Sequence, residues 1–224
     1  MIEKEEGGDF QSLSRIQRWF EINCDGDWEN NYGVLIDTVG NPGWSVEIDL
    51  SSTILERVEF TEIKENYEDE TSWLFVKKAD NVLFGSGGTP TLDRILEIMS
   101  DWVTENASLS EAKTAGSSEP LSIIQAWYEA NCDGEWEREY GVEIKTLDSP
   151  GWKVEVDLAW TKLEDLEFKM IRENDEQESS WLVVEKEGDK LVGSCGIHAL
   201  DRLLALMSDW ILSCWLALPD DDSE

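Results

Sequence analysis

Apolar residues near the start of the chain recur at intervals of three and four positions. Leu13, Ile16, Trp19 and Phe20 follow this spacing, which predicts an amphipathic helix. A Cys-Asp-Gly sequence comes next and supplies a stop signal. The same spacing returns between Leu92 and Trp102, which predicts a second helix.

The residues between the two predicted helices alternate between apolar and polar, as in antiparallel β-strands. Tyr32–Val39 and Trp44–Leu50 flank the sequence Asn41-Pro42-Gly43, whose Pro-Gly pair favours a tight turn. They therefore predict a hairpin. Further strands are expected at residues 59–66, 72–78 and 82–85.

The second half of the chain repeats the first at a constant offset of 108 residues, as from Trp19 to Trp127. Residues 13–104 align with 121–212 without a gap, and roughly half of the aligned positions are identical. The period is too long for a solenoid repeat, so each copy is expected to be a small domain with its own core. The predicted fold class is α+β, with two homologous units, each an antiparallel β meander of about four or five strands flanked by an N-terminal and a C-terminal helix.

The duplication and the local composition divide the chain into four segments. Residues 1–104 form the first repeat with a short acidic N-terminal arm, 105–120 a linker rich in Ser, Ala, Glu and Gly, 121–218 the second repeat, and 219–224 an acidic tail. A flexible linker of about 16 residues lets the repeats lie side by side. We therefore expect an intramolecular pseudo-dimer.

The last predicted helix of the second repeat continues into an apolar extension that the first repeat lacks. The extension contains Ile211, Leu212, Trp215, Leu216 and Leu218. A helix of this kind is apolar on more than one side. We expect it to pack on its own repeat or between the repeats, and an exposed helix that binds a partner is the alternative.

The charge balance is strongly acidic. The 224 residues include 18 Lys and Arg against 50 Asp and Glu, for a net charge of −32 and a pI of about 4.1. This excludes a non-specific nucleic-acid binder, which needs a positive surface. Hydrophobic residues make up 41% and there are twelve tryptophans, so the chain is a folding protein and not a disordered acidic tail. The charge fits either a solvated surface or the steering of basic partners.

The sequence shows no signal for export or for membrane insertion. The first ten residues contain neither a basic region nor an apolar run, and the longest apolar stretch, Trp210–Leu218, is far shorter than the roughly 20 residues that span a bilayer. We expect a soluble cytoplasmic protein with no membrane partner. Its four cysteines, which show no metal-binding spacing, are expected to be reduced thiols: Cys24, Cys132, Cys195 and Cys214.

Signals for catalysis or metal binding are weak. Acidic residues at 25, 27 and 29 have the spacing of a calcium loop, but the twelfth position is Ile36, where such a loop needs a glutamate. Cys195 and His198 lie three residues apart only in the second repeat, which does not favour a nucleophile and base. Residues 85–88, Gly-Ser-Gly-Gly, fit a turn before a helix better than an anion cradle. We predict a non-enzymatic protein with no catalytic residues, no cofactor and no metal.

The most unusual local feature is an acidic and aromatic stretch that follows the first helix of each repeat. Exposed Trp and Tyr beside carboxylates are typical of a hot spot for a basic partner. The competing interpretation is a connection from helix to strand, in which Asp caps backbone donors and Trp belongs to the core. The predicted partner-binding residues are Asp25, Asp27, Trp28, Glu29 and Tyr32, with Asp133, Glu135, Trp136, Glu137 and Tyr140.

Two long runs resemble immunity protein 53 of bacterial polymorphic toxin systems. They read IQRWFEINCDGDWENNYGVLIDTVGNPGWSVEIDL and IIQAWYEANCDGEWEREYGVEIKTLDSPGWKVEVDL, and the resemblance extends to SWLFVKKADNVLFGSGG and DRILEIMSDW. It implies a non-enzymatic inhibitor that binds and blocks the toxic domain of a cognate effector, which the charge indicates to be basic and which could be a nuclease. Two other classes stay open, an acidic DNA mimic that inhibits nucleases and a tandem carbohydrate-binding module.

Overall fold

The computed structural model describes residues 10–107 and 119–217. The two described segments have the same order of helices and strands apart from η2, a short 3₁₀ helix found only in the first, and the α+β class is confirmed. The first repeat contains α1 (Phe10–Asn23), the 3₁₀ helix η1 (Trp28–Asn30), β1 (Val34–Val39), β2 (Gly43–Asp49), β3 (Ile63–Glu65), β4 (Leu74–Ala79), β5 (Val82–Gly88), η2 (Thr89–Thr91) and α2 (Leu92–Asn106). The second contains α3 (Glu119–Asn131), η3 (Trp136–Arg138), β6 (Val142–Leu147), β7 (Gly151–Asp157), β8 (Ile171–Glu173), β9 (Leu182–Glu187), β10 (Lys190–Gly196) and α4 (Leu200–Ala217).

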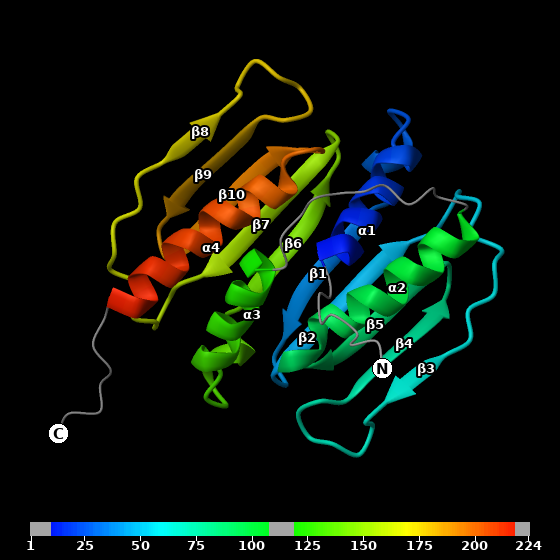
Figure 1. The fold of residues 1–224 in the computed structure, drawn as a ribbon, viewed down its shortest axis with the longest axis horizontal. Helices are drawn as coiled ribbons and strands as arrows, with labels where there is room; N and C mark the ends of the chain where they lie inside the picture. Colours follow the sequence, from blue (N-terminus) through cyan, green and yellow to red (C-terminus); the bar gives the residue numbers. More distant parts are fainter. Residues whose placement is uncertain (1–9, 108–118, 218–224) are drawn as a thin grey trace, which may run out of the picture.

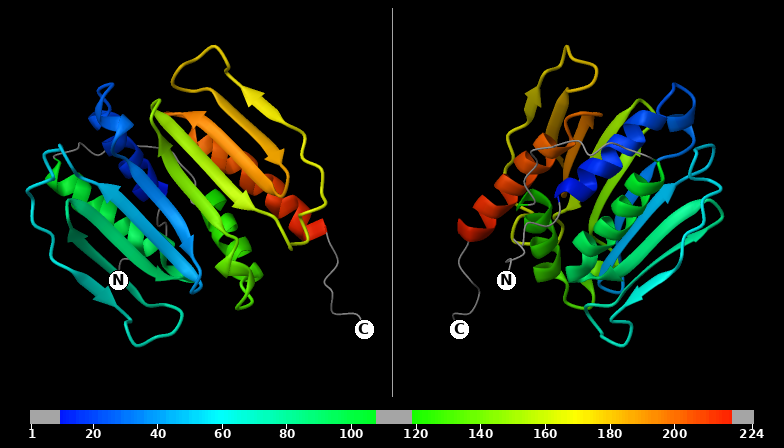
Figure 2. Two further views of the ribbon diagram at one scale, coloured as in Figure 1. Left: turned by 180° about the vertical axis from the view of Figure 1, so that it is seen from behind. Right: turned by 45° about the vertical axis from the view of Figure 1, so that its right-hand side comes forward.

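The strands of both repeats form one antiparallel sheet of ten strands, in the order β3-β4-β5-β2-β1-β6-β7-β10-β9-β8. The repeats meet where β1 pairs with β6, with Ile36 opposite its own counterpart Ile144. All four long helices cover the same face of the sheet (Figure 1), and the view from behind shows the other face without helices (Figure 2). The alternation of buried and half-buried residues along the strands follows from this layered arrangement.

The strand order departs from a simple meander at one point in each repeat. The predicted hairpin of β1 and β2 is present, but the second neighbour of β2 is β5, and β3 lies at the edge of the sheet. β5 lies between β4 and β2, and α2 packs closely against it. A Cβ at Gly85 would contact the side chains of Ile95 and Met99 on α2, so a residue without a side chain is needed there.

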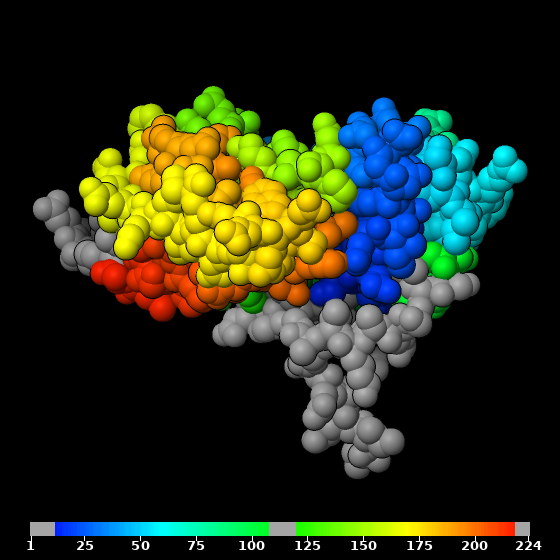
Figure 3. All heavy atoms as spheres, turned by 90° about the horizontal axis from the view of Figure 1, so that it is seen from above, coloured from blue at the N-terminus to red at the C-terminus, as the bar shows by residue number. Residues whose placement is uncertain are grey.

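The expectation that each repeat has a core of its own is wrong. The rings of Phe20 on α1 and Trp152 on β7 lie 5.6 Å apart, and those of Tyr128 on α3 and Trp44 on β2 lie 5.2 Å apart. Each first helix thus packs on the other repeat's strand, and the buried residues form a single cluster that spans both repeats. The space-filling view shows the two repeats in contact along their boundary (Figure 3).

The boundary between β1 and β6 also explains the Tyr-Gly-Val sequence of each repeat. The amide of Val142 donates to Thr38 Oγ1 at 3.0 Å, and the amide of Val34 donates to Thr146 Oγ1 at 3.0 Å. A Cβ on Gly141 would overlap Thr38, and one on Gly33 would overlap Thr146. Both glycines therefore make room for a threonine of the opposite repeat. We call the β1–β6 pair with Thr38, Thr146 and these two glycines the seam.

The ends of the predicted segments are partly described. Helix α2 continues to Asn106 and α3 begins at Glu119, so the predicted linker is shortened at both ends; its middle, the N-terminal arm and the acidic tail lie outside the described residues. In the apolar extension of α4, Ile211 is fully buried and Trp215 packs partly against the core, whereas Leu216 is exposed and Leu218 lies outside the described part. Over the described ranges, none of the helices has the length and apolar character needed to cross a membrane.

Candidate functional site

The loop after α1 is held together by two carboxylates that accept backbone hydrogen bonds. The amides of Asp27 and Trp28 donate to Asp25 Oδ1 at 3.0 and 2.9 Å. The amides of Asp25 and Gly26 donate to the Glu29 carboxylate at 3.0 Å each. Gly26 has φ +97°, a conformation that favours glycine. We call residues 24–29, held by these hydrogen bonds, the CDG loop.

The second repeat has the same loop. Asp133 Oδ1 accepts from the amides of Glu135 and Trp136 at 2.8 and 2.9 Å, and Glu137 accepts from those of Asp133 and Gly134 at 3.1 Å each. The two hydrogen bonds that Asp133 accepts lower its pKa, because they stabilise the ionised carboxylate. The two equivalent hydrogen bonds lower the pKa of Asp25 in the same way. The calcium-like spacing therefore reflects a loop in which two of the three acidic side chains bind the backbone.

The two tryptophans of the CDG loops are buried, so the expectation that they are exposed is wrong. Trp28 and Trp136 are each 6% exposed, and their indole nitrogens donate to the carbonyls of Ser51 and Ala159 at 2.8 and 2.7 Å. Trp28 also makes an edge contact with Trp19, with ring centres 5.6 Å apart. The indole is buried because both its ring and its N–H group find partners in the fold.

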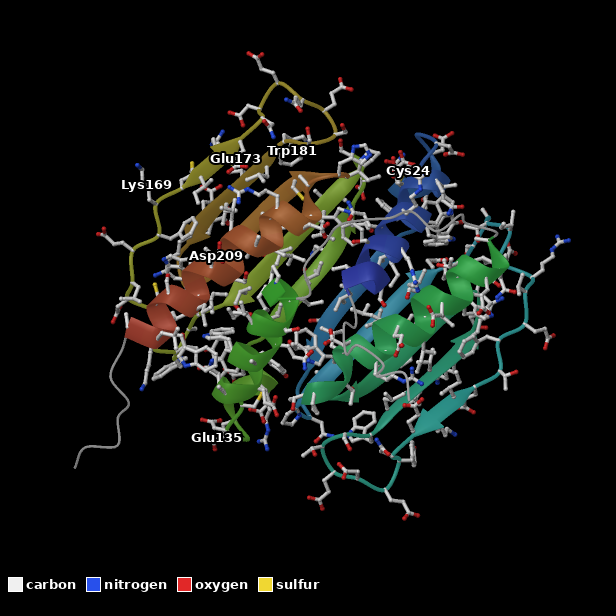
Figure 4. All side chains as sticks on the ribbon, viewed as in Figure 1. Cys24, Glu135, Lys169, Glu173, Trp181 and Asp209 are labelled. Carbon is white, nitrogen blue, oxygen red and sulfur yellow. The ribbon has the colours of Figure 1, made fainter. Side chains whose placement is uncertain are left out.

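The other predicted residues divide into buried, half-buried and exposed side chains. Glu29 and Glu137 are buried, Tyr32 and Tyr140 are half-buried, and the exposed members are Asp25, Asp27, Asp133 and Glu135. The structure does not bring the predicted residues of the first repeat and those of the second into one patch. Cys24, at the start of one CDG loop, and Glu135, within the other, lie at opposite ends of the helical layer (Figure 4).

Each CDG loop opens into a groove that both repeats line, on either side of the seam. The first groove, beside Tyr32, has a volume of about 310 Å³ and is completed by Thr146 and Asp148 of the second repeat. The second groove, beside Tyr140, has a volume of about 410 Å³ and is completed by Asp37, Thr38 and Gly40 of the first. The two grooves use equivalent positions, so they are related by the internal symmetry of the sheet.

Both grooves are acidic, but their charges are arranged differently. Four carboxylates and no Lys or Arg are among the described residues that line the first groove: Glu29, Glu47, Asp49 and Asp148. The second groove also has basic residues, which are partly neutralised. Lys145 lies 2.5 Å from Glu143, and Lys190 lies 3.1 Å from Asp157. Burial, reinforced by Glu143, raises the pKa of Asp37 in this groove.

A residue that the sequence patterns did not single out, Trp160, is the most exposed tryptophan in the described ranges, which include all twelve. Its side chain is 82% exposed, and its indole nitrogen donates to Tyr140 Oη at 3.1 Å. The position equivalent to Trp160 in the first repeat is Ser52. A signal was therefore present in the sequence, because Trp160 is a tryptophan that breaks the 108-residue correspondence.

Cys195 is buried, and His198 and the glycines of β5 have other partners in the fold. Burial raises the pKa of the Cys195 thiol to about 12, and His198 Nε2 contacts Glu21 Oε1 at 2.8 Å instead of the thiol. Gly85, Gly87 and Gly88 belong to β5, where added side chains would meet neighbouring residues. Within residues 10–107 and 119–217, no group of three or more His, Cys, Asp or Glu side chains could hold a metal ion.

Comparison with protein-family models gives the same duplication as the structure. The model of immunity protein 53 matches residues 13–104 and again residues 121–211. The chain belongs to the immunity protein 53 family. The two matches cover most of the chain, and they confirm both the resemblance seen in the sequence and its tandem arrangement. Searches among curated proteins and among solved structures gave no match.

Proposed function

We propose that this member of the immunity protein 53 family binds a cognate bacterial toxin domain and blocks it by steric and electrostatic occlusion, without catalysis. The observation that carries the proposal is the family match over both repeats. The net charge of −32 and the acidic lining of both grooves support a basic toxin domain, such as a nuclease that binds phosphates. The proposal places the protein in the cytoplasm of the cell that makes the toxin.

The exposed members of the predicted site are the contacts that we propose for the CDG loops. Asp27 and Glu135 are exposed and occupy equivalent positions, so each carboxylate is accessible to a basic partner at its own loop. Tyr32 and Tyr140 line the two grooves next to them. Reversing the charge of Glu29 or Glu137 would instead break the loops, because both carboxylates are buried and bind backbone amides.

The test is binding and neutralisation of the toxin domain encoded next to this gene, measured with the full chain at low and high salt. We expect tight binding that weakens with salt, because exposed charge pairs are screened. The double variant Asp27→Lys, Glu135→Lys should bind more weakly, chiefly through slower association.

A matched control keeps the overall charge change the same. Glu68→Lys, Glu176→Lys alters another exposed pair of equivalent positions by the same amount. Weaker binding by the first double variant alone would support contacts at the CDG loops, and equal losses would indicate only a general charge effect. No binding by the unaltered chain would contradict the proposed function, and equal inhibition of unrelated nucleases would favour a DNA mimic.

A further inference from the structure

Trp160 lies in the connection that follows β7, where both repeats have the same backbone conformation. Its φ is +60°, and that of Ser52 in the first repeat is +61°. The amides of both residues donate to an equivalent glutamate at 2.9 Å, Glu164 for Trp160 and Glu56 for Ser52. The local fold is thus the same in the two repeats, and the exposed indole is what the second repeat adds.

The indole borders a pocket of about 480 Å³ that is both aromatic and acidic. Its lining includes the rings of Tyr140 and Trp160, four carboxylates and one lysine. The lysine, Lys190, lies 3.1 Å from Asp157, which offsets its charge. The remaining carboxylates of the lining are Glu164, Glu187 and Asp189. We call this site the Trp160 pocket.

The first repeat lacks the exposed indole and two of the carboxylates that line this pocket in the second repeat. The positions equivalent to Trp160, Glu187 and Asp189 are Ser52, Ala79 and Asn81. Thus the second repeat carries an additional aromatic ring and two additional carboxylates around one pocket. It also carries a cation, because Lys190 replaces Val82, but that cation is paired with Asp157.

We propose that the Trp160 pocket receives a lysine or arginine side chain of the toxin, and that the second repeat is therefore the principal binding repeat. The inference rests on the proposed function and names the chemistry of the contact. A cation placed over an indole face is attracted by the ring, and nearby carboxylates add to that attraction. The hydrogen bond from the indole to Tyr140 holds the ring in place before the partner arrives, which reduces the ordering cost of binding.

The pocket is continuous with the second groove, since Tyr140, Asp157 and Lys190 line both. A basic segment of the toxin that follows the groove can therefore place one side chain against Trp160. Trp and Tyr are the residue types enriched at the centres of interfaces that carry most of the binding energy. The geometry thus assigns the anchor to Trp160 and the steering to the surrounding carboxylates.

The experiment compares toxin binding by the full-length protein and by variants that carry first-repeat residues. Trp160→Ser places serine where the first repeat already has one at the same φ, so we expect unchanged thermal unfolding. We expect its Kd to rise by about tenfold or more. Tyr67→Ser is the control, since it removes an aromatic ring that is 64% exposed in the first repeat, and it should bind like the unaltered protein.

A second variant tests the carboxylates. Glu187→Ala, Asp189→Asn also introduces first-repeat residues, and we expect slower association at low salt with a smaller difference at high salt. Full affinity of a folded Trp160→Ser protein would overturn the inference and leave the proposed function standing. Absence of toxin binding by the unaltered protein would overturn both.

Discussion

Asp25 and Glu29 have the spacing of metal-binding carboxylates, but they accept hydrogen bonds from backbone amides instead. Each accepts hydrogen bonds from two amides of the same loop, and their counterparts in the second repeat do the same. The sequence predicted that Asp caps backbone donors as one of two interpretations, and the structure confirms it. Periodicity could not decide the exposure of Trp28, because its burial depends on the carbonyl of Ser51, which is distant in sequence.

Asp201 gives a prediction about pH. It lies in the first turn of α4, its Oδ1 atom is buried without a hydrogen-bond partner, and burial raises its pKa. A carboxyl group whose pKa is raised by folding favours the folded state at low pH, where it is protonated, and this contribution is lost as pH rises through the folded pKa. We therefore expect Asp201→Asn to gain stability relative to the unaltered protein as pH rises above about 4.

The measurement is urea unfolding at several pH values. The stability difference should reach on the order of 1 kcal/mol and then stay constant toward neutral pH. Asp209→Asn, at an exposed position on the same helix, is the control for removing a carboxylate charge from α4. A difference between Asp201→Asn and the unaltered protein that does not change with pH would contradict this account.

At the scale of elements, the seam joins two edge strands that would otherwise be open. β1 and β6 pair around Ile36 and Ile144, and the threonines on either side donate or accept across the boundary. An unpaired edge strand is a site for association with other chains, so the pairing removes an edge from each repeat. The sequence predicted the strands but not this partner, because alternation does not say which edges meet.

Gly141→Ala should weaken the seam. The added methyl group would overlap Thr38, so the strand or the threonine must shift, and we expect a loss of about 1–3 kcal/mol in the free energy of unfolding. Gly33→Ala should have a similar effect through Thr146, because the repeats are related by symmetry. Urea unfolding measures both losses.

A double variant tests the cause. Thr38→Ala removes the overlapping hydroxyl, so Thr38→Ala, Gly141→Ala should be less destabilised than the sum of the two single variants. Strict additivity would mean that the cost of Gly141→Ala arises elsewhere. The same comparison can be made with Thr146 and Gly33.

At the scale of the whole molecule, the two repeats are joined in one sheet and one cluster of buried residues. The sheet is continuous, and Phe20 and Tyr128 each pack against a tryptophan of the other repeat. Separation would expose these rings and two strand edges. Burial of such aromatic side chains contributes several kcal/mol, with truncation costing about 3–5 kcal/mol for each.

Residues 1–112 and 113–224, produced separately, should therefore fail to form stable monomers. Each should aggregate or self-associate through its open edge, and the two mixed together should recover one stoichiometric complex. Size-exclusion chromatography and thermal unfolding measure this, with the full chain as the reference. Two monomeric halves as stable as the full chain would show that the shared core is dispensable.

The amino-acid sequence by itself determined the duplication, the class of the fold, the positions of the helices and strands, the family and the acidic character. These depend on local periodicity, on turn residues and on the similarity of one half to the other, all of which are visible along the chain. Only the tertiary structure decided that the repeats share one sheet and one core, that Trp28 and Trp136 are buried, and that Trp160 lies beside Tyr140 and a set of carboxylates. These features depend on which strand edges and side chains meet across long sequence separations, and pairing of that kind is set by packing in three dimensions.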